Sequence, residues 1–150
     1  MRIFERLEDI AAAQGEHLGY SSWLDITQER IDAFADATED HQWIHVDPHA
    51  AAAGPFGATI AHGYLTLALL PALLAQILEI RGAKMVMNYG TQKVRFLAPV
   101  PVDSRVRLGL ELQSTEQTAT GLRIQLEATL EIEGVDRPAL VAEVLYLAVP

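Results

Sequence analysis

The chain contains no cysteine, and its basic residues are far fewer than its acidic ones. Without cysteine, disulfides, thiolate nucleophiles and cysteine-ligated metal sites are excluded, and because this composition suits a reducing compartment we expect a cytoplasmic protein. Eleven lysines and arginines against twenty acidic residues give a formal charge of -9. Binding to nucleic acid requires a basic face that releases counterions from the phosphates, so we expect no nucleic-acid partner.

A membrane-spanning pattern is also lacking. The longest mainly apolar stretch, residues 65–78, has 14 residues and includes Thr66, Pro71 and Gln76, whereas a span needs about 20 apolar residues. The first ten residues include acidic side chains and no apolar stretch of the signal-peptide type. We therefore expect no secretion signal and no membrane association, and interpret residues 65–78 as part of a buried helix.

Half of the 150 residues are apolar, which is enough to bury the core of one domain, so we expect residues 1–150 to form a single domain. The basic residues gather in one part of the chain. Residues 81–107 contain one acid, Asp103, against six bases: Arg81, Lys84, Lys93, Arg95, Arg105 and Arg107. This local excess suits a polyanionic small ligand, and it equally suits solvated charges at strand edges.

The first half of the chain shows mainly helical periodicity. Apolar residues at helical spacing predict an amphipathic helix within residues 1–15, and residues 16–23 have the pattern of a first strand. A second helix, capped by Asp25 or Thr27, is expected to fade near Thr38.

Residues 62–80 are apolar on every side of the helix that their length predicts. A helix of this kind must be surrounded, and a sheet that wraps it would supply the cover. Pro71 is expected to kink this helix, and Gly82 is expected to end it.

The second half of the chain alternates polar and apolar residues with a period of two. This alternation over residues 105–112 and 122–133 is typical of strands with one buried and one wet face. Residues 85–97 and 140–149 are expected to form two further strands, and short turns between the strands favour an antiparallel meander of sequential neighbours. The pattern therefore predicts an α+β protein in which one antiparallel β-sheet wraps a long central α-helix.

The candidate site lies within residues 37–70, which hold four of the five histidines. On one continuous helix Asp40 and His45 would point about 140° apart, because five residues turn roughly 500°. They converge only if Asp40 closes a helix and His45 lies beyond the break, which Pro48 supports. A carboxylate beside an imidazole is suited to proton transfer near neutral pH.

His62 and Gly63 stand at the head of the long apolar helix. A helix N-terminus carries partial positive charge and free N–H groups that suit a developing oxyanion, and glycine lets a substrate approach closely. His62 is interpreted as a residue that anchors the loop by hydrogen bonding, with a catalytic role as the alternative.

Three histidines at intervals of four residues, His41, His45 and His49, invite comparison with a metal site. Pro48 interrupts any helix that would align all three, and no fourth ligand is evident in the sequence. We therefore expect no bound metal.

The segment Asp40-His-Gln-Trp-Ile-His45, followed by Ala61-His-Gly-Tyr-Leu65, resembles the signature of the MaoC-like dehydratases, or (R)-specific enoyl-CoA hydratases (hydratase 2). The branch that it most resembles is the nodulation-protein-N-like one. The resemblance covers nearly the whole chain and implies the hot-dog fold. It also implies syn addition of water to a trans-2-enoyl-CoA, giving the (R)-3-hydroxyacyl product, or the reverse dehydration.

The resemblance assigns roles by position. Asp40 and His45 would bind and activate the water, one taking its proton and one supplying a proton to the α-carbon. The backbone N–H of Gly63 would hold the thioester oxygen as it becomes enolate-like. A homodimer is also expected, because an edge strand as apolar as residues 85–97 would aggregate if left open.

The motif departs from the family pattern at Glu39, Gln42 and Trp43, where members commonly have glycine, asparagine and proline. Gln42 keeps an amide, whereas Trp43 is expected to reshape the acyl tunnel. We also assign Phe56, His62, Tyr64, Lys93 and Arg95 to substrate binding. Phe56 and Tyr64 would line the acyl pocket, His62 would hold its loop, and the two bases would meet coenzyme A. Simple packing is the alternative for Trp43, Phe56 and Tyr64.

No cofactor is expected, because coenzyme A would be part of the substrate. Two other functions on the same fold stay open. An acyl-CoA thioesterase would need a carboxylate on the long helix, yet that stretch has no acid before Glu79. A non-catalytic acyl-binding module would not need an Asp–His pair beside a helix that begins with glycine.

Overall fold

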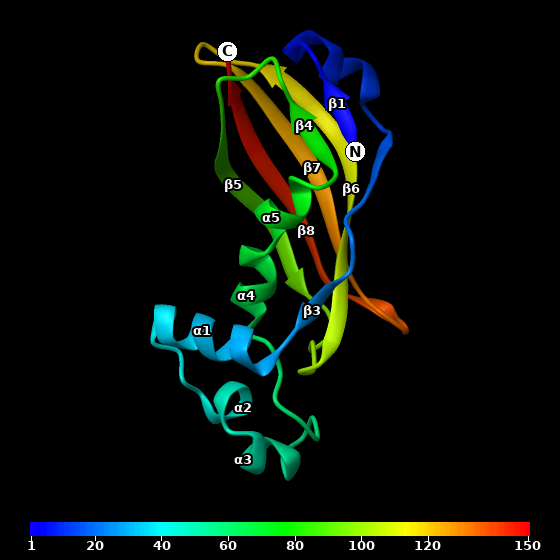
Figure 1. The fold of residues 1–150 in the computed structure, drawn as a ribbon. Coiled ribbons are helices and arrows are strands. Elements are labelled where there is room, and N and C mark those ends of the chain that lie inside the picture. Colours follow the sequence, from blue (N-terminus) through cyan, green and yellow to red (C-terminus); the bar gives the residue numbers. More distant parts are fainter.

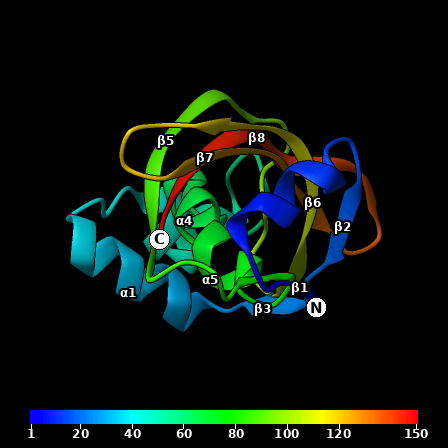
Figure 2. The same cartoon turned by 90° about the horizontal axis from the view of Figure 1, so that it is seen from above.

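A curved, six-stranded sheet dominates the computed structural model, which describes residues 1–150. The strand order is β2-β6-β7-β8-β5, and β3 pairs alongside β6. Figures 1 and 2 show this sheet curling around the helical segments α4 and α5. The strands are β2 (His17–Tyr20), β3 (Leu24–Ile26), β5 (Met85–Phe96), β6 (Ser104–Gln117), β7 (Leu122–Ile132) and β8 (Val135–Val149).

Strands β6, β7 and β8 form the expected antiparallel meander. In β7 every second residue is buried, as the period-two pattern predicted. The expectation of sequential neighbours is wrong for β5, which pairs antiparallel with β8 and not with β6. The alternation of polar and apolar residues indicates which face of a strand is buried, but not which strands lie beside it. With β5 on the far side of β8, the sheet can curl around the helices.

The central helix is shorter than the predicted span of residues 62–80. It consists of α4 (Gly63–Ala68) and α5 (Leu70–Leu74), with a break in the helix at Leu69. Pro71 lies at the start of α5, where its missing N–H costs no hydrogen bond. The expected kink is therefore present as a division into two helices, and Gly82 does not end either of them.

After a turn at residues 75–77, the end of the predicted helix becomes β4 (Leu78–Ile80), which pairs in parallel with β1 (Arg2–Phe4). The amphipathic helix expected over residues 1–15 is consequently divided into β1 and a 3-10 helix, η1 (Leu7–Ala13). Tertiary pairing between two segments far apart in sequence overrides the local helical periodicity of both.

Helix α1 (Gln28–Thr38) begins and ends as predicted. The hydroxyl of Thr27 caps it by accepting a hydrogen bond from the Arg30 N–H (3.2 Å), whereas Asp25 lies in β3. Two short helices follow, α2 (Trp43–Val46) and α3 (Pro48–Ala52). Together α1, α2 and α3 form a helical lobe at one end of the sheet (Figure 1).

One hydrophobic cluster of 30 buried residues joins the elements, with Leu65, Leu70 and Leu73 of the central helices inside it. Most of its other members come from the inward faces of β6, β7 and β8. None of the helices is long and apolar enough to cross a membrane.

Candidate active site

Asp40 and His45 lie close together because no continuous helix joins them, as the sequence predicted. Helix α1 ends at Thr38, Glu39 adopts a left-handed conformation (φ 61°), and Asp40 follows in the loop before α2, which carries His45. Side-chain ligand atoms of Asp40, His45 and His62 all lie within 4.8 Å of one another. The left-handed turn reverses the chain, so an acid and an imidazole that a continuous helix would separate come together.

His45 is buried, with 6% of its surface exposed. Its Nδ1–H donates a hydrogen bond to the carbonyl oxygen of Ile60 (2.7 Å), which leaves the lone pair on Nε2. Burial lowers the pKa of His45 below its ordinary value, and the neighbouring His62 acts in the same direction, against the raising effects of the Ile60 bond and the Asp40 charge. The result is a neutral imidazole with a free lone pair, the state that a general base requires.

A second group of hydrogen bonds holds the backbone of His45. Gln28 of α1 donates to the His45 carbonyl (2.8 Å), and Thr59 donates to the Gln28 side-chain oxygen (2.5 Å). The Ile60 N–H donates to the Ile44 carbonyl (3.0 Å). Neither Gln28 nor Thr59 was singled out in the sequence, because a single glutamine and a single threonine carry no periodic or motif signal.

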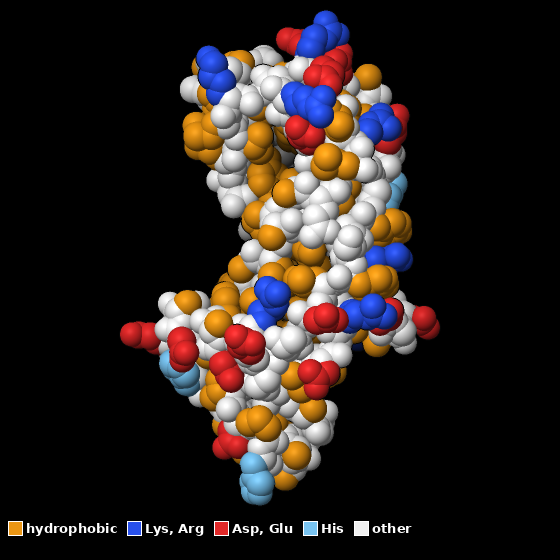
Figure 3. All heavy atoms as spheres, viewed as in Figure 1, with side chains coloured by type: hydrophobic (Ala, Val, Ile, Leu, Met, Phe, Trp, Pro, Cys, Tyr) orange, Lys and Arg blue, Asp and Glu red, His pale blue; other side chains and the backbone are white.

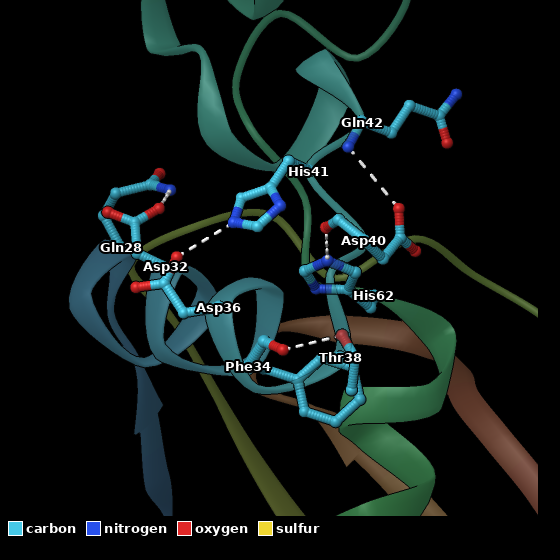
Figure 4. A network of polar contacts seen from close by, with 9 residues as sticks. All are labelled: Gln28, Asp32, Phe34, Asp36, Thr38, Asp40, His41, Gln42 and His62. Atoms are coloured by element: carbon cyan, nitrogen blue, oxygen red, sulfur yellow. Dashed lines mark hydrogen bonds and ion pairs between the residues drawn. The ribbon is translucent and has the colours of Figure 1, made fainter.

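His62 links the loop of Asp40 to the head of α4. Figure 4 shows its Nε2–H donating to the backbone carbonyl of Asp40 (2.9 Å), so the predicted anchoring hydrogen bond is present. Its ring stacks on that of His45, with centroids 3.8 Å apart and planes inclined by 22°. On its other side the ring meets Phe34 at a tilted angle (5.0 Å).

Gly63 is the first residue of α4, so its N–H has no acceptor within the helix. It borders a hollow of about 220 Å³ next to His45, whose other lining includes Thr66 and Phe96. A Cβ added at Gly63 would lie 3.1 Å from the ring of Phe96. The glycine therefore permits close approach from two sides, by the Phe96 ring and by any ligand in the hollow.

Phe96 was missed in the sequence, where it is one apolar residue among several in the strand of residues 85–97. In the structure its ring is half-exposed and meets the exposed ring of Tyr64 edge-on, with centroids 6.0 Å apart. Since β5 lies next to β8 and not next to β6, only the tertiary structure brings Phe96 to the head of α4. The two rings form an aromatic wall beside Gly63.

None of the seven predicted substrate-binding residues lines this hollow. The side chain of Gln42 points away from His62 in Figure 4, and its backbone N–H forms a long hydrogen bond to the Asp40 carboxylate (3.4 Å). The ring of Trp43 packs against Gly54, where an added Cβ would meet it at 2.9 Å. Phe56 is half-exposed in the following loop.

The basic residues of 81–107 are mostly neutralised by acids from neighbouring elements. Four of the six form ion pairs: Arg81 with Glu5 and Glu79, Lys93 with Glu143, Arg105 with Glu133, and Arg107 with Glu131. Lys84 and Arg95 have no ion-pair partner. Of the two bases assigned to coenzyme A, Arg95 is thus the one whose charge is free for a ligand.

The cluster of Asp40, His45 and His62 has the composition of a metal site. Two imidazoles bind one ion only when their nitrogen lone pairs converge on it at about 2.0–2.1 Å. Rings that stack at 3.8 Å direct their lone pairs along nearly parallel planes, so His45 and His62 in this arrangement do not converge. His41 is directed elsewhere, to Asp36 of α1 (2.9 Å), which raises the pKa of its imidazole.

A separate apolar groove runs along the central helical segments α4 and α5. It consists of two adjoining hollows of about 290 and 470 Å³, which share Pro71, Asn88 and Tyr146 in their walls. Figure 3 shows apolar side chains lining this hollowed face. Its walls come from α4, α5 and β4 on one side and from the strands β5, β7 and β8 on the other, and we call it the α5 groove.

Comparison with known proteins agrees with these features. Residues 9–133 match the family described as "MaoC like domain". The chain is 56% identical over 151 residues to 3-hydroxyacyl-thioester dehydratase Z of Mycobacterium tuberculosis, covering 99% of this chain and 100% of that protein. It is 48% identical over 139 residues to Nodulation protein N of Rhizobium leguminosarum bv. viciae, covering 91% of this chain and 86% of that protein.

Among solved structures, R-Hydratase PhaJ1 from Pseudomonas aeruginosa matches with a TM-score of 0.74 and 24% identity. The match covers 90% of this chain and 81% of that one, and it confirms the hot-dog fold. The resemblance stated from the Asp40-to-His45 and Ala61-to-Leu65 segments is likewise confirmed by the family match and by the identity of the relatives. The chain belongs to the MaoC-like domain family.

Proposed function

We propose that the protein is an (R)-specific enoyl-CoA hydratase, also able to run the reverse dehydration of a 3-hydroxyacyl-CoA. The observation that carries the proposal is the buried imidazole of His45 within 4.8 Å of the carboxylate of Asp40, at the edge of a hollow bordered by Gly63. The printed names of the relatives, a 3-hydroxyacyl-thioester dehydratase and an R-hydratase, support the same chemistry.

In the hydration direction, a water molecule would be held between Asp40 and His45. As the water oxygen bonds to C3 of the enoyl thioester, Nε2 of His45 takes one of its protons and Asp40 accepts a hydrogen bond from the other. The electrons of the C2=C3 bond move toward the thioester oxygen, which the Gly63 N–H stabilises. The proton on His45 then passes to C2 on the same face, so the addition is syn and no net proton is gained or lost.

The apolar lining of the α5 groove is evidence that the rest of the substrate is an acyl chain. Eight of the ten residues around its 290 Å³ hollow are hydrophobic, and its 470 Å³ hollow reaches Leu67 and Ala68 of α4, the helix that begins at Gly63. An acyl chain whose thioester lies at Gly63 would follow this surface. Arg95 on β5 is the base that we assign to the phosphates of coenzyme A.

We also propose that two copies pair through β5. Eleven of its twelve residues are exposed and Val94 is half-buried, although the strand carries Met85, Val86, Met87 and Tyr89. An apolar edge strand of this length attracts another chain, and pairing with its twin across a two-fold axis would remove the open edge. Light scattering at micromolar concentration is expected to give the mass of a dimer, and a stable monomer would contradict this part of the proposal.

The decisive experiment compares crotonyl-CoA with a saturated acyl-CoA. A hydratase consumes the enoyl absorbance of crotonyl-CoA and leaves the saturated thioester intact. Release of free coenzyme A from the saturated thioester would instead indicate a thioesterase, although α4 and α5 contain no carboxylate to serve one. Binding of both thioesters without turnover would indicate a non-catalytic acyl-binding module.

A further inference from the structure

The ring of His62 contains the one buried side-chain polar atom in the molecule that has no hydrogen-bond partner, Nδ1. The residue is only 2% exposed, so water does not reach this atom freely. An unpaired buried polar atom costs stability, and a phenylalanine ring in the same place would avoid the cost. What His62 does with its other atoms must therefore explain its presence.

The backbone of Asp40 has one side-chain hydrogen bond from a distant part of the chain, and its donor is His62. Within residues 39–42 the other side-chain hydrogen bonds are local: Gln42 N–H to Asp40, and His41 to Asp36. The His62 Nε2–H reaches the Asp40 carbonyl from 22 residues away, at the head of α4. It is the one side-chain hydrogen bond that joins the backbone of Asp40 to the head of α4.

His45 does not depend on His62 in the same way. Its ring is held by the carbonyl of Ile60 (2.7 Å) and its backbone by Gln28 (2.8 Å). The stacked ring of His62, 3.8 Å away, adds a flat surface against which the His45 imidazole rests. The two catalytic candidates are thus held unequally, and the weakly held one is Asp40.

We propose that His62 is a positioning residue that sets the backbone of Asp40 relative to the imidazole of His45. Its Nε2–H donates a hydrogen bond to the Asp40 carbonyl, and its ring packs between the loop of Asp40 and the ring of His45. An imidazole provides both an N–H donor and a flat ring, and its second nitrogen, Nδ1, is left without a partner. The catalytic part of this inference rests on the proposed hydratase function. Because His45 has its own anchors, the N–H donor is the part of His62 on which activity depends.

Two substitutions test the N–H donor and the aromatic ring of His62 independently. His62→Phe keeps a flat ring and loses the donor, whereas His62→Gln keeps an N–H donor of similar reach and loses the ring. For His62→Phe we expect kcat for crotonyl-CoA to fall roughly 10- to 100-fold, since misplacement by about 1 Å can cost 100-fold, with KM little changed. For His62→Gln we expect recovery of kcat to within about fivefold of the parent protein.

Melting temperatures on the same preparations give the second readout. We expect His62→Phe to melt at or above the temperature of the parent protein, because it removes the unpaired nitrogen, and because Asp40 is an exposed residue whose carbonyl can then bind water. A lowered melting temperature with full kcat per folded molecule would overturn the proposal. So would an equal loss of kcat in the two variants.

A third readout does not require turnover. Nitrogen NMR of the imidazoles is expected to find opposite tautomers, with the hydrogen on Nε2 of His62 and on Nδ1 of His45. Amide exchange at residues 40–42 is expected to be faster in His62→Phe than in His62→Gln. The reverse tautomer at His62, or unchanged exchange in His62→Phe, would overturn the positioning role whatever the activity. If the tautomers and the amide exchange are as expected but the protein hydrates no enoyl thioester, the proposed function is contradicted and the positioning role of His62 is not.

Discussion

The head of α4 and the flank of α5 have opposite surroundings, although the two short helices follow each other directly in the chain. At the head, Asp40, His45 and His62 form a compact polar cluster joined by one hydrogen bond, from His62 to the Asp40 carbonyl, and by ring stacking of the two histidines. Along the flank, the α5 groove is open and lined mainly by apolar side chains. The polar end provides groups for proton transfer and the apolar flank provides only contact area, so chemistry and chain selection are expected to be separable by mutation.

The largest effect is expected from the polar end. Asp40→Asn and His45→Gln should each lower kcat for crotonyl-CoA by ~10²–10⁴-fold, the usual contribution of a general acid–base group. The double variant should lose little more than the worse single one, because the two residues act as a unit. Steady-state kinetics with circular dichroism on the same samples measures both. The exposed His41→Gln is the matched control, and near-normal turnover in either single variant would remove Asp40 and His45 from the mechanism.

Gly63→Ala tests the oxyanion role at the same end. Loss or misplacement of such a donor typically lowers kcat by ~10²–10³-fold. The added methyl would also lie 3.1 Å from the half-exposed Phe96 ring, which must shift to make room. The double variant Gly63→Ala/Phe96→Leu relieves that contact. If kcat stays low in the double variant, the methyl acts on the thioester, whereas full recovery would mean that Gly63 only makes room for Phe96.

The apolar flank is expected to respond to chain length alone. Ala75→Phe places a ring in the α5 groove, at a position exposed enough to tolerate it. Each buried methylene contributes about 0.8 kcal/mol, roughly fourfold in kcat/KM, so long enoyl-CoA substrates should lose several-fold while crotonyl-CoA does not. Measuring kcat/KM across an acyl series checks this. An equal loss for all chain lengths would show that the groove does not hold the chain.

A few-fold effect is expected from the single free base near the site. Arg95→Glu should raise KM for crotonyl-CoA more than Lys93→Glu does, because Lys93 is already neutralised by Glu143 (2.7 Å). An S-crotonyl pantetheine thioester lacks the nucleotide phosphates and should respond to neither change. If that substrate responds as strongly as crotonyl-CoA, Arg95 has a structural role.

The smallest effect is a displacement of the pH profile. His45 acts as a base in its neutral form, and burial lowers its pKa below the ordinary value of about 6.5 for histidine. As the pH is lowered, kcat/KM should therefore still be at its plateau value at pH 6.5 and should fall only at lower pH. The charged or titratable groups that face this ring are Asp40, which raises its pKa, and His62, which lowers it. In His62→Gln the acid limb should therefore move to higher pH. An acid limb already above pH 6.5 in the parent protein would contradict a neutral, buried base.

Much of this protein was predictable from local patterns. The spacing of Asp40, His45, Pro48 and Gly63 predicted a helix end, a turn and a second helix head, and the structure has all three. Alternation predicted the buried faces of β6 and β7. These features depend on residues within one or two turns of each other, where caps, prolines and period-two patterns act directly.

Other features arise from contacts between distant segments, on which periodicity carries no information. Pairing of β4 with β1 shortened the central helix, and pairing of β5 with β8 brought Phe96 to Gly63. Acids from neighbouring elements neutralised most of the basic stretch. The sequence by itself determined which residue types are available for proton transfer, through the order of acid, histidine and glycine. Only the tertiary structure decided how firmly each is held and which bases remain free, because hydrogen bonds and ion pairs form between whatever atoms the fold brings within about 3 Å.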